Sequence, residues 1–178
     1  KENGRLMMPA YKIHSASDKL SSHFKVLEFF QSSRANELSL SNYPPEARLY
    51  EIIVANLREL CGAILEPLRE HYGRAITISS GYRSVTVNRV VGGSLTSQHT
   101  QGKAADILVK GISPLDVSKY IASSSLPYDQ VIYEVRNSIW THVSHDPTRP
   151  IQRHQALQSL HVGVYEPLVI SIHEETKS

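Results

Sequence analysis

The sequence predicts a single domain that combines helices with strands, and three observations support this. Apolar residues recur every three or four positions from about residue 45 to 72, which predicts a long amphipathic helix. Short apolar runs follow, and those at 130–135 and 139–144 have the spacing of an antiparallel hairpin. The length of 178 residues is enough for one domain with a substantial core and short for two.

The first part of the chain is expected to lead into the long helix. Residues 1–19 show no hydrophobic period and are interpreted as an N-terminal arm. Residues 21–30 are interpreted as an extended piece that runs into a helical turn, and residues 32–42 as a loop. The long helix then begins at the proline pair 44–45, because proline is tolerated in a first helical turn, and it ends before Gly73.

The remaining chain is expected to alternate strands with short helices. Two strands and two helices are expected before the hairpin, the strands at 75–79 and 104–109 and the helices at 84–90 and 113–123. After the hairpin, a further helix is expected near 151–160, followed by alternating runs around Glu166-Pro167. The main domain is therefore expected to span residues 20–160, with 161–178 as a C-terminal extension.

Composition is that of an ordinary globular protein and argues against several classes. Apolar residues make up 40% of the chain and charged residues 20%. The net charge of +2 and the lack of a basic block argue against a nucleic-acid-binding protein. No run approaches the ~18 apolar residues that a membrane span needs. The one cysteine, Cys61, excludes an internal disulfide and has the helical spacing of a core residue.

Metal-ligating residue types are concentrated in residues 97–106. His99 and Asp106 stand on either side of Gly102, which lets the backbone turn so that both side chains can face one ion. His142 supplies a second imidazole, and its position on a hairpin strand fixes its direction. Two imidazoles and a carboxylate with an open fourth position are typical of catalytic zinc, whereas structural zinc is usually closed by four protein ligands. We therefore predict that these three residues bind one Zn²⁺.

Two more residues would complete a hydrolytic site. Glu134 ends the first hairpin strand, and the hairpin can bring it near His142 on one face, where it could accept a proton from water. Arg83 follows a strand, and an arginine there can hold a substrate carboxylate or the oxyanion of hydrolysis. Zinc lowers the pKa of bound water toward ~7 and polarises carbonyl groups, which is the chemistry of amide or ester hydrolysis.

Each candidate also has an ordinary structural interpretation. His99 and Asp106 could be a surface histidine and a solvated aspartate, Arg83 a surface or ion-pair arginine, and Glu134 a strand-end carboxylate. Trp140 is expected in the core or on a pocket wall rather than stacked on substrate. The remaining histidines are interpreted as structural or surface residues, with a place near the site left open for His145: His14, His23, His71, His145, His154, His161 and His173.

Several motifs together resemble a known family. They are the loop 80–84, Asn88, Gly92-Gly93, Ser97-Gln98-His99, Gly102, Ala104-Ala105-Asp106 and Trp140-Thr141-His142-Val143-Ser144. In this combination they resemble the zinc D-alanyl-D-alanine peptidases of bacterial cell walls, a group that includes phage endolysin peptidases and shares its fold with the hedgehog signalling domain. The similarity runs from about Leu20 to about Leu157. It implies an α+β fold, with a small, mostly antiparallel sheet and helices packed on one side.

The resemblance also implies roles for individual residues. By position, His99, Asp106 and His142 match the family's zinc ligands, and Arg83 matches its substrate-binding and oxyanion-stabilising arginine. Ser97 and Trp140 are also expected to line the substrate site. Many members carry an acid three residues before the last histidine, where this chain has Ile139. In the hedgehog-like arrangement the acid instead ends the preceding strand, as Glu134 does here.

The leading hypothesis is a zinc metallopeptidase that cuts the peptide part of bacterial peptidoglycan, as a D,D-carboxypeptidase or an endopeptidase. It would act at the cell wall, either phage-encoded and released or exported, with no nucleic-acid partner and no membrane span. One alternative is a zinc-containing module that binds wall peptides or a protein partner without cleaving, which the missing acid at position 139 favours. The other is a phage structural protein. The bond that is cut and the oligomeric state stay open.

Overall fold

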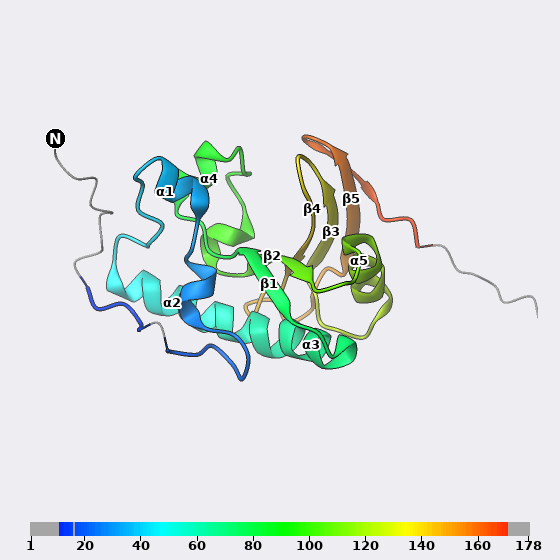
Figure 1. Ribbon diagram of the computed structural model, residues 1–178, viewed down its shortest axis with the longest axis horizontal. Helices are drawn as coiled ribbons and strands as arrows, with labels where there is room; N and C mark the ends of the chain where they lie inside the picture. The colour runs from blue at the N-terminus through cyan, green and yellow to red at the C-terminus, as the bar shows by residue number, and fades with distance from the viewer. Residues whose placement is uncertain (1–10, 16, 171–178) are drawn as a thin grey trace, which may run out of the picture.

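The computed structural model describes residues 11–15 and 17–170, in which one six-stranded sheet carries helices on one face (Figure 1). The strands are β1 (Ile76–Ser80), β2 (Ala104–Val109), β3 (Gln130–Val135), β4 (Ile139–Ser144), β5 (Gln155–His161) and β6 (Val164–Pro167). Their order across the sheet is β1-β2-β4-β3-β5-β6. Only β3 and β5 pair in parallel, and the other neighbours are antiparallel. The predicted α+β fold with a mostly antiparallel sheet is confirmed.

The helices confirm the long amphipathic segment and the two short helices that follow it. In chain order the helical elements are η1 (Val26–Phe29), α1 (Ser33–Glu37), α2 (Ala47–Leu60), η2 (Cys61–Leu65), α3 (Glu66–Tyr72), α4 (Val85–Val90), η3 (Gln98–Gln101) and α5 (Pro114–Ser123). The π-helical turn η2 joins α2 to α3, so these three form one long rod along the lower edge of Figure 1. Gly73 ends the rod with a φ of 57°, a left-handed conformation that glycine adopts without steric cost.

The core lies between these helices and one face of the sheet. Strand side chains alternate between faces, so Ala105, Val131 and Val143 from three central strands point toward the helices. Leu57 of α2 and Ile121 of α5 meet them, and all five are fully buried. Burying a side chain such as Leu57 contributes roughly 1.5–3 kcal/mol. The alternate residues of the same strands are thereby directed to the opposite face.

Two local predictions were wrong. The segment 32–42, predicted as a loop, contains α1, which Ser32 caps by accepting a hydrogen bond of 3.2 Å from the Ala35 N–H. The helix predicted near 151–160 is the strand β5 instead. Parallel pairing with β3 satisfies its backbone groups and places Ala156 and Leu157 on opposite faces of the sheet. This pairing depends on a distant segment, and it outweighs the local helical pattern.

Both ends of the described chain contact the main domain. The Tyr11 hydroxyl donates a 2.7 Å hydrogen bond to the Pro44 carbonyl, while residues 1–10 and 16 of the predicted arm lie outside the described residues. At the other end, β6 pairs with β5, so the sheet continues past the boundary expected at residue 160. The last part of the predicted extension, 171–178, also lies outside the described residues. Within the described part, no helix is long and apolar enough to cross a membrane.

Candidate metal centre and its cleft

Two imidazoles and one carboxylate converge on the sheet face opposite the core. Asp106 of β2 and His142 of β4 are direct cross-strand partners, which places their side chains next to each other on one face. The short helix η3 carries His99 to the same point. All three side chains are buried. The structure therefore brings together the three residues that the sequence predicted as ligands.

Three atoms of this cluster lie at mutual distances that suit one metal ion. The Nε2 atom of His99 is 3.1 Å from Nδ1 of His142 and 3.2 Å from Oδ1 of Asp106. The same Oδ1 is 3.0 Å from Nδ1 of His142. Ligand atoms at ~2.0–2.1 Å from a tetrahedral zinc would be about 3.3 Å apart. Among the described residues, His99, Asp106 and His142 form the group whose ligand atoms lie close enough together, within 4.8 Å of one another, to hold a metal ion.

The orientation of His99 is set by its other ring nitrogen. Its Nδ1 lies 2.6 Å from the Gly81 carbonyl, and because a carbonyl can only accept, Nδ1 carries the proton. Nε2 therefore presents its lone pair to the other two ligands, as a zinc-binding imidazole must. Burial lowers the pKa of His99, which favours this neutral form.

Gly81 can play this part because its backbone passes very close to another segment. A Cβ at Gly81 would lie 2.6 Å from the Cα and carbonyl oxygen of Phe29, which is too close for any side chain. The adjacent Tyr82 N–H donates a 2.7 Å hydrogen bond to that same Phe29 carbonyl. The loop that orients His99 is thus held directly against η1.

Asp106 divides its two oxygens between the metal cluster and Arg83. The Arg83 Nη2 atom donates a 2.6 Å hydrogen bond to Oδ2, while its Nε donates to the Ser80 hydroxyl at 2.9 Å. Burial alone would raise the pKa of Asp106, but its interactions with His99 and His142 and the charge of Arg83 outweigh it and hold that pKa well below its usual range. The carboxylate is therefore ionised, as a metal ligand requires.

The Arg83 loop is held on both sides by Asn42, a residue outside the motifs predicted to form the site. Its Nδ2 donates 3.0 Å hydrogen bonds to the carbonyls of Phe30 and Tyr82, and its Oδ1 accepts one of 2.8 Å from the Ser84 N–H. Asn42 is buried and all three bonds go to the backbone. No sequence signal separates it from an ordinary loop asparagine, because its partners are fixed only by the fold.

Glu134 lies on the same sheet face as the cluster, as predicted. The β3–β4 register places Ile132 opposite His142 and Glu134 opposite Trp140, so the carboxylate is two residues, roughly 7 Å, farther along β3. The Glu134 side chain is 14% exposed, and Nη2 of Arg136 lies 3.3 Å from its Oε2. Burial raises the pKa of Glu134, and the nearby His142 and Arg136 only partly oppose this.

The cluster opens into a cleft of about 1040 Å³. The sheet forms its floor, and segments from α4 to η3 and from the β5–β6 turn form its walls. Every residue predicted at the site lines it, namely Arg83, Ser97, His99, Asp106, Glu134, Trp140 and His142. Four arginines but only two carboxylates also face it: Arg34, Arg83, Arg136 and Arg153, against Asp106 and Glu134. The lining is therefore net positive even before a metal is counted.

Other candidate groups have structural roles. His145 follows β4, and its Nδ1 donates a 2.7 Å hydrogen bond to the Pro127 carbonyl, outside the cluster. Cys61 is fully buried, and burial raises the pKa of its thiol, so it is a core residue as predicted.

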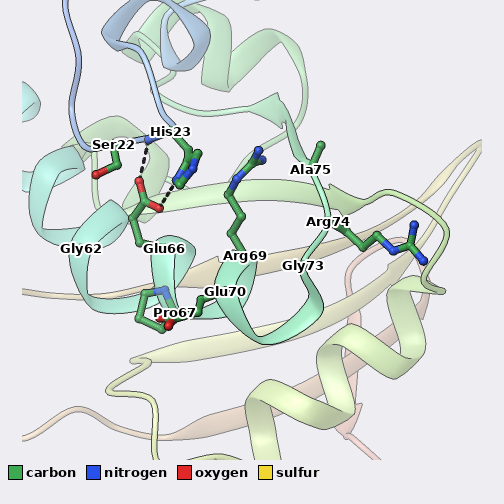
Figure 2. Close-up of a pocket in the computed structure, with 10 residues that line it drawn as sticks. All are labelled: Ser22, His23, Gly62, Glu66, Pro67, Arg69, Glu70, Gly73, Arg74 and Ala75. Carbon is green, nitrogen blue, oxygen red and sulfur yellow. Dashed lines mark hydrogen bonds and ion pairs between the residues drawn. The ribbon is translucent and has the colours of Figure 1, made fainter.

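A second cleft of about 590 Å³ lies along α3, where the Glu66 carboxylate accepts hydrogen bonds from the backbone N–H and the ring of His23 (Figure 2). It holds no cluster of three ligands among the described residues.

Comparison with known proteins is consistent with this geometry. No curated protein matches the sequence. The family model described as peptidase M15 matches residues 22–144, which is more than half of the chain. The match contains all three cluster residues as well as Arg83 and Glu134, and it ends with β4, before β5 and β6 begin. M15 peptidases are zinc-dependent, and the cluster fits that metal in ligand type and spacing. The chain belongs to the peptidase M15 family.

Proposed function

We propose that this M15 peptidase uses zinc to hydrolyse peptide bonds in the peptide part of bacterial peptidoglycan, as a D,D-carboxypeptidase or an endopeptidase. The observation that carries the proposal is the convergence of His99, Asp106 and His142 in a cleft that also contains Glu134 and Arg83. The cell-wall substrate is supported by the sequence resemblance to D-alanyl-D-alanine peptidases. Action at the cell wall, after export or phage release, follows from that substrate.

Glu134 is the proposed acid–base group. Zinc at this site supplies a Lewis acid that polarises a carbonyl and brings the pKa of water toward ~7. Glu134 accepts the proton of the attacking water and returns it to the leaving amine. Its burial raises its pKa toward the pH range in which a carboxyl group can both accept and donate protons. The Glu134 side chain is largely buried, which restricts its orientation, and it lines the cleft where substrate would bind.

Arg83 is the proposed group that meets negative charge on the substrate. Its Nε and Nη2 are engaged by Ser80 and Asp106, so the guanidinium plane is fixed. Its Nη1 has no hydrogen-bond partner among the described residues, and the side chain lines the cleft. A fixed guanidinium beside the metal cluster can stabilise the oxyanion of hydrolysis or bind a terminal carboxylate.

The test is cleavage of defined substrates by purified, zinc-loaded protein. A muropeptide ending in D-Ala-D-Ala and intact sacculi separate the two modes, because a carboxypeptidase releases free D-alanine and an endopeptidase opens cross-links. Glu134→Gln should keep its zinc but lower kcat by ~10²–10⁴-fold. The control is Glu59→Gln, an exposed position on α2, which should match wild type. Absence of cleavage of either substrate by the zinc-loaded wild type would refute the proposal.

A zinc-containing binding module is the second candidate function. It is favoured by Ile139, an exposed residue of β4 at the position where the resemblance implies an acid in many members. In the same experiment, binding of the muropeptide without turnover, and with no difference between wild type and Glu134→Gln, would support this function in place of hydrolysis.

A further inference from the structure

A second arginine of the cleft, Arg153, is fixed by a carboxylate that is completely buried. Asp129 is 0% exposed, and its Oδ2 accepts a 2.6 Å hydrogen bond from Arg153 Nη2. Arg153 Nε lies 3.1 Å from Oδ1 and 3.0 Å from Oδ2, and the Arg153 backbone N–H donates to Oδ1 at 3.0 Å. Backbone and side chain are therefore both anchored. An arginine held in this way loses little conformational entropy when it binds a further group.

The outer edge of Arg153 remains available to the cleft. Its side chain is 40% exposed and lines the cleft, and Nη1 has no hydrogen-bond partner among the described residues. The charge on Asp129 is also shared, because Nε of Arg149 lies 3.6 Å from its Oδ1. Arg149 also lies 3.3 Å from Oδ2 of Asp146, whose Oδ1 is 2.7 Å from Nζ of Lys103, so two carboxylates face three cationic groups here. A net positive charge is left at this end of the cleft, which favours an anionic ligand.

The sheet register gives the approximate offset along β3 between the metal cluster and Asp129, the residue that anchors Arg153. Asp129 immediately precedes β3, whose Ile132 stands opposite His142. Gln130, next to Asp129, is two residues from Ile132, roughly 7 Å along the strand. Glu134 is two residues from Ile132 in the other direction, so the cluster lies between the Glu134 end and the Arg153 end. An extended peptide advances ~3.3–3.6 Å per residue, so this offset corresponds to about two substrate residues.

Gln98 couples this end of the cleft to the metal cluster. Its Nε2 donates a 2.9 Å hydrogen bond to Oδ2 of Asp129, and its Oε1 lies 3.4 Å from Nη2 of Arg153. Gln98 is the immediate neighbour of His99 in η3. A substrate lying along the sheet floor between η3 and β5 would therefore contact the metal cluster and Arg153 at the same time.

We propose that Arg153 is a specificity-determining residue that binds a free carboxylate carried by the substrate about two residues from the scissile bond. The inference deepens the proposed peptidase function and rests on it. Arg153 lies beyond the residues 22–144 that the M15 family model matches. Its partners Asp129 and Gln98 lie within the match, together with the proposed catalytic residues.

The first test needs no mutation. Wild-type kcat/KM is measured on pairs of peptides that differ only in one carboxylate replaced by a carboxamide, with that group moved along successive positions on each side of the scissile bond. A charge-assisted hydrogen bond of this kind should favour the acid over the amide about tenfold or more, at one position about two residues from the bond. Cleavage of both members of every pair at equal rates would overturn the role of Arg153 alone. Cleavage of none would overturn the proposed function itself.

The second test assigns the preference to the residue. Arg153→Gln and Arg153→Lys should raise KM for the acidic peptide about tenfold and reduce the acid-to-amide preference toward one, with a much smaller effect on kcat. The matched control is Arg149→Gln, which also removes a charge near Asp129 but does not line the cleft. It should retain the full preference. Zinc content and unfolding midpoints verify that each variant is folded. A preference that survives in both Arg153 variants, or an equal loss of kcat on both peptides, would overturn the inference.

Discussion

Replacement of Asn42 by alanine should destabilise the protein far more than its position in a loop suggests. The substitution removes three buried hydrogen bonds, to the Phe30 and Tyr82 carbonyls and from the Ser84 N–H. Each such bond contributes ~0.5–1.5 kcal/mol, and a buried backbone group left without a partner costs ~1–3 kcal/mol. Because the vacated space lets some of these groups recover partners, we expect a total loss of about 3–4 kcal/mol. At ~2–4 °C per kcal/mol for a chain of this size, Tm should fall by about 10 °C.

The same variant should also impair the site, because Tyr82 and Ser84 flank Arg83 directly. Urea and thermal unfolding are measured in a chelator, so that bound zinc does not contribute to stability. Catalytic efficiency is then measured with saturating zinc. The control is Asn56→Ala, which removes one exposed hydrogen bond of 2.8 Å to the Gln101 carbonyl and places a better helix former in α2. If the two variants unfold within about 1 kcal/mol of each other, the role assigned to Asn42 is wrong.

Two further predictions concern the metal and the acid stability of the fold. Zinc at 100 times its Kd should stabilise the wild type against unfolding by ~2.7 kcal/mol. The His99→Ala variant should contain no stoichiometric zinc by elemental analysis, and its Tm should not rise when zinc is added. A Tm that still rises with zinc would contradict the ligand assignment. Burial would raise the pKa of Asp146, but hydrogen bonds from Lys103 and Thr148 outweigh it and lower that pKa to about 2. The ionised carboxylate should therefore add about 2 kcal/mol to the free energy of unfolding above about pH 4, and this stability should be lost as the pH falls toward 2. The difference in unfolding free energy between wild type and Asp146→Asn should shrink over that interval, and a difference independent of pH would count against this account.

Local sequence patterns were sufficient where the residue type itself carries the geometry. The hairpin strands at 130–135 and 139–144 and the strand at 104–109 were predicted with the bounds that the structure shows, because alternation and turn residues define them locally. The three ligands were predicted because imidazole and carboxylate groups are good zinc ligands, and because the surrounding motifs together resemble a known family. The signal for the strands lies within a few residues of each one, whereas the signal for the ligands is the combination of motifs spread over residues 80–144.

What the sequence did not reveal depends on contacts between distant segments. β5 was predicted as a helix because its residues permit either structure, and only its parallel partner β3 decides between them. Asn42 and the Asp129–Arg153 pair were not singled out for a similar reason. Asn42 acts on the loop around Arg83, and Asp129 acts on a residue 24 positions away. A lone asparagine or aspartate gives no indication of which distant backbone or side chain it will meet.

The two arginines proposed to meet substrate differ in how directly they affect the metal. Arg83 donates to Oδ2 of Asp106, so its removal would weaken a ligand as well as a substrate contact, and a higher KM could reflect lost zinc. Arg153 touches none of the three cluster residues, and its anchor Asp129 reaches the cluster only through Gln98, the neighbour of His99. Substitution of Arg83 should therefore lower zinc affinity and kcat together, whereas substitution of Arg153 should change KM at constant zinc content. Zinc titration of both variants beside their kinetics would separate the residue that supports the metal from the residue that selects the substrate.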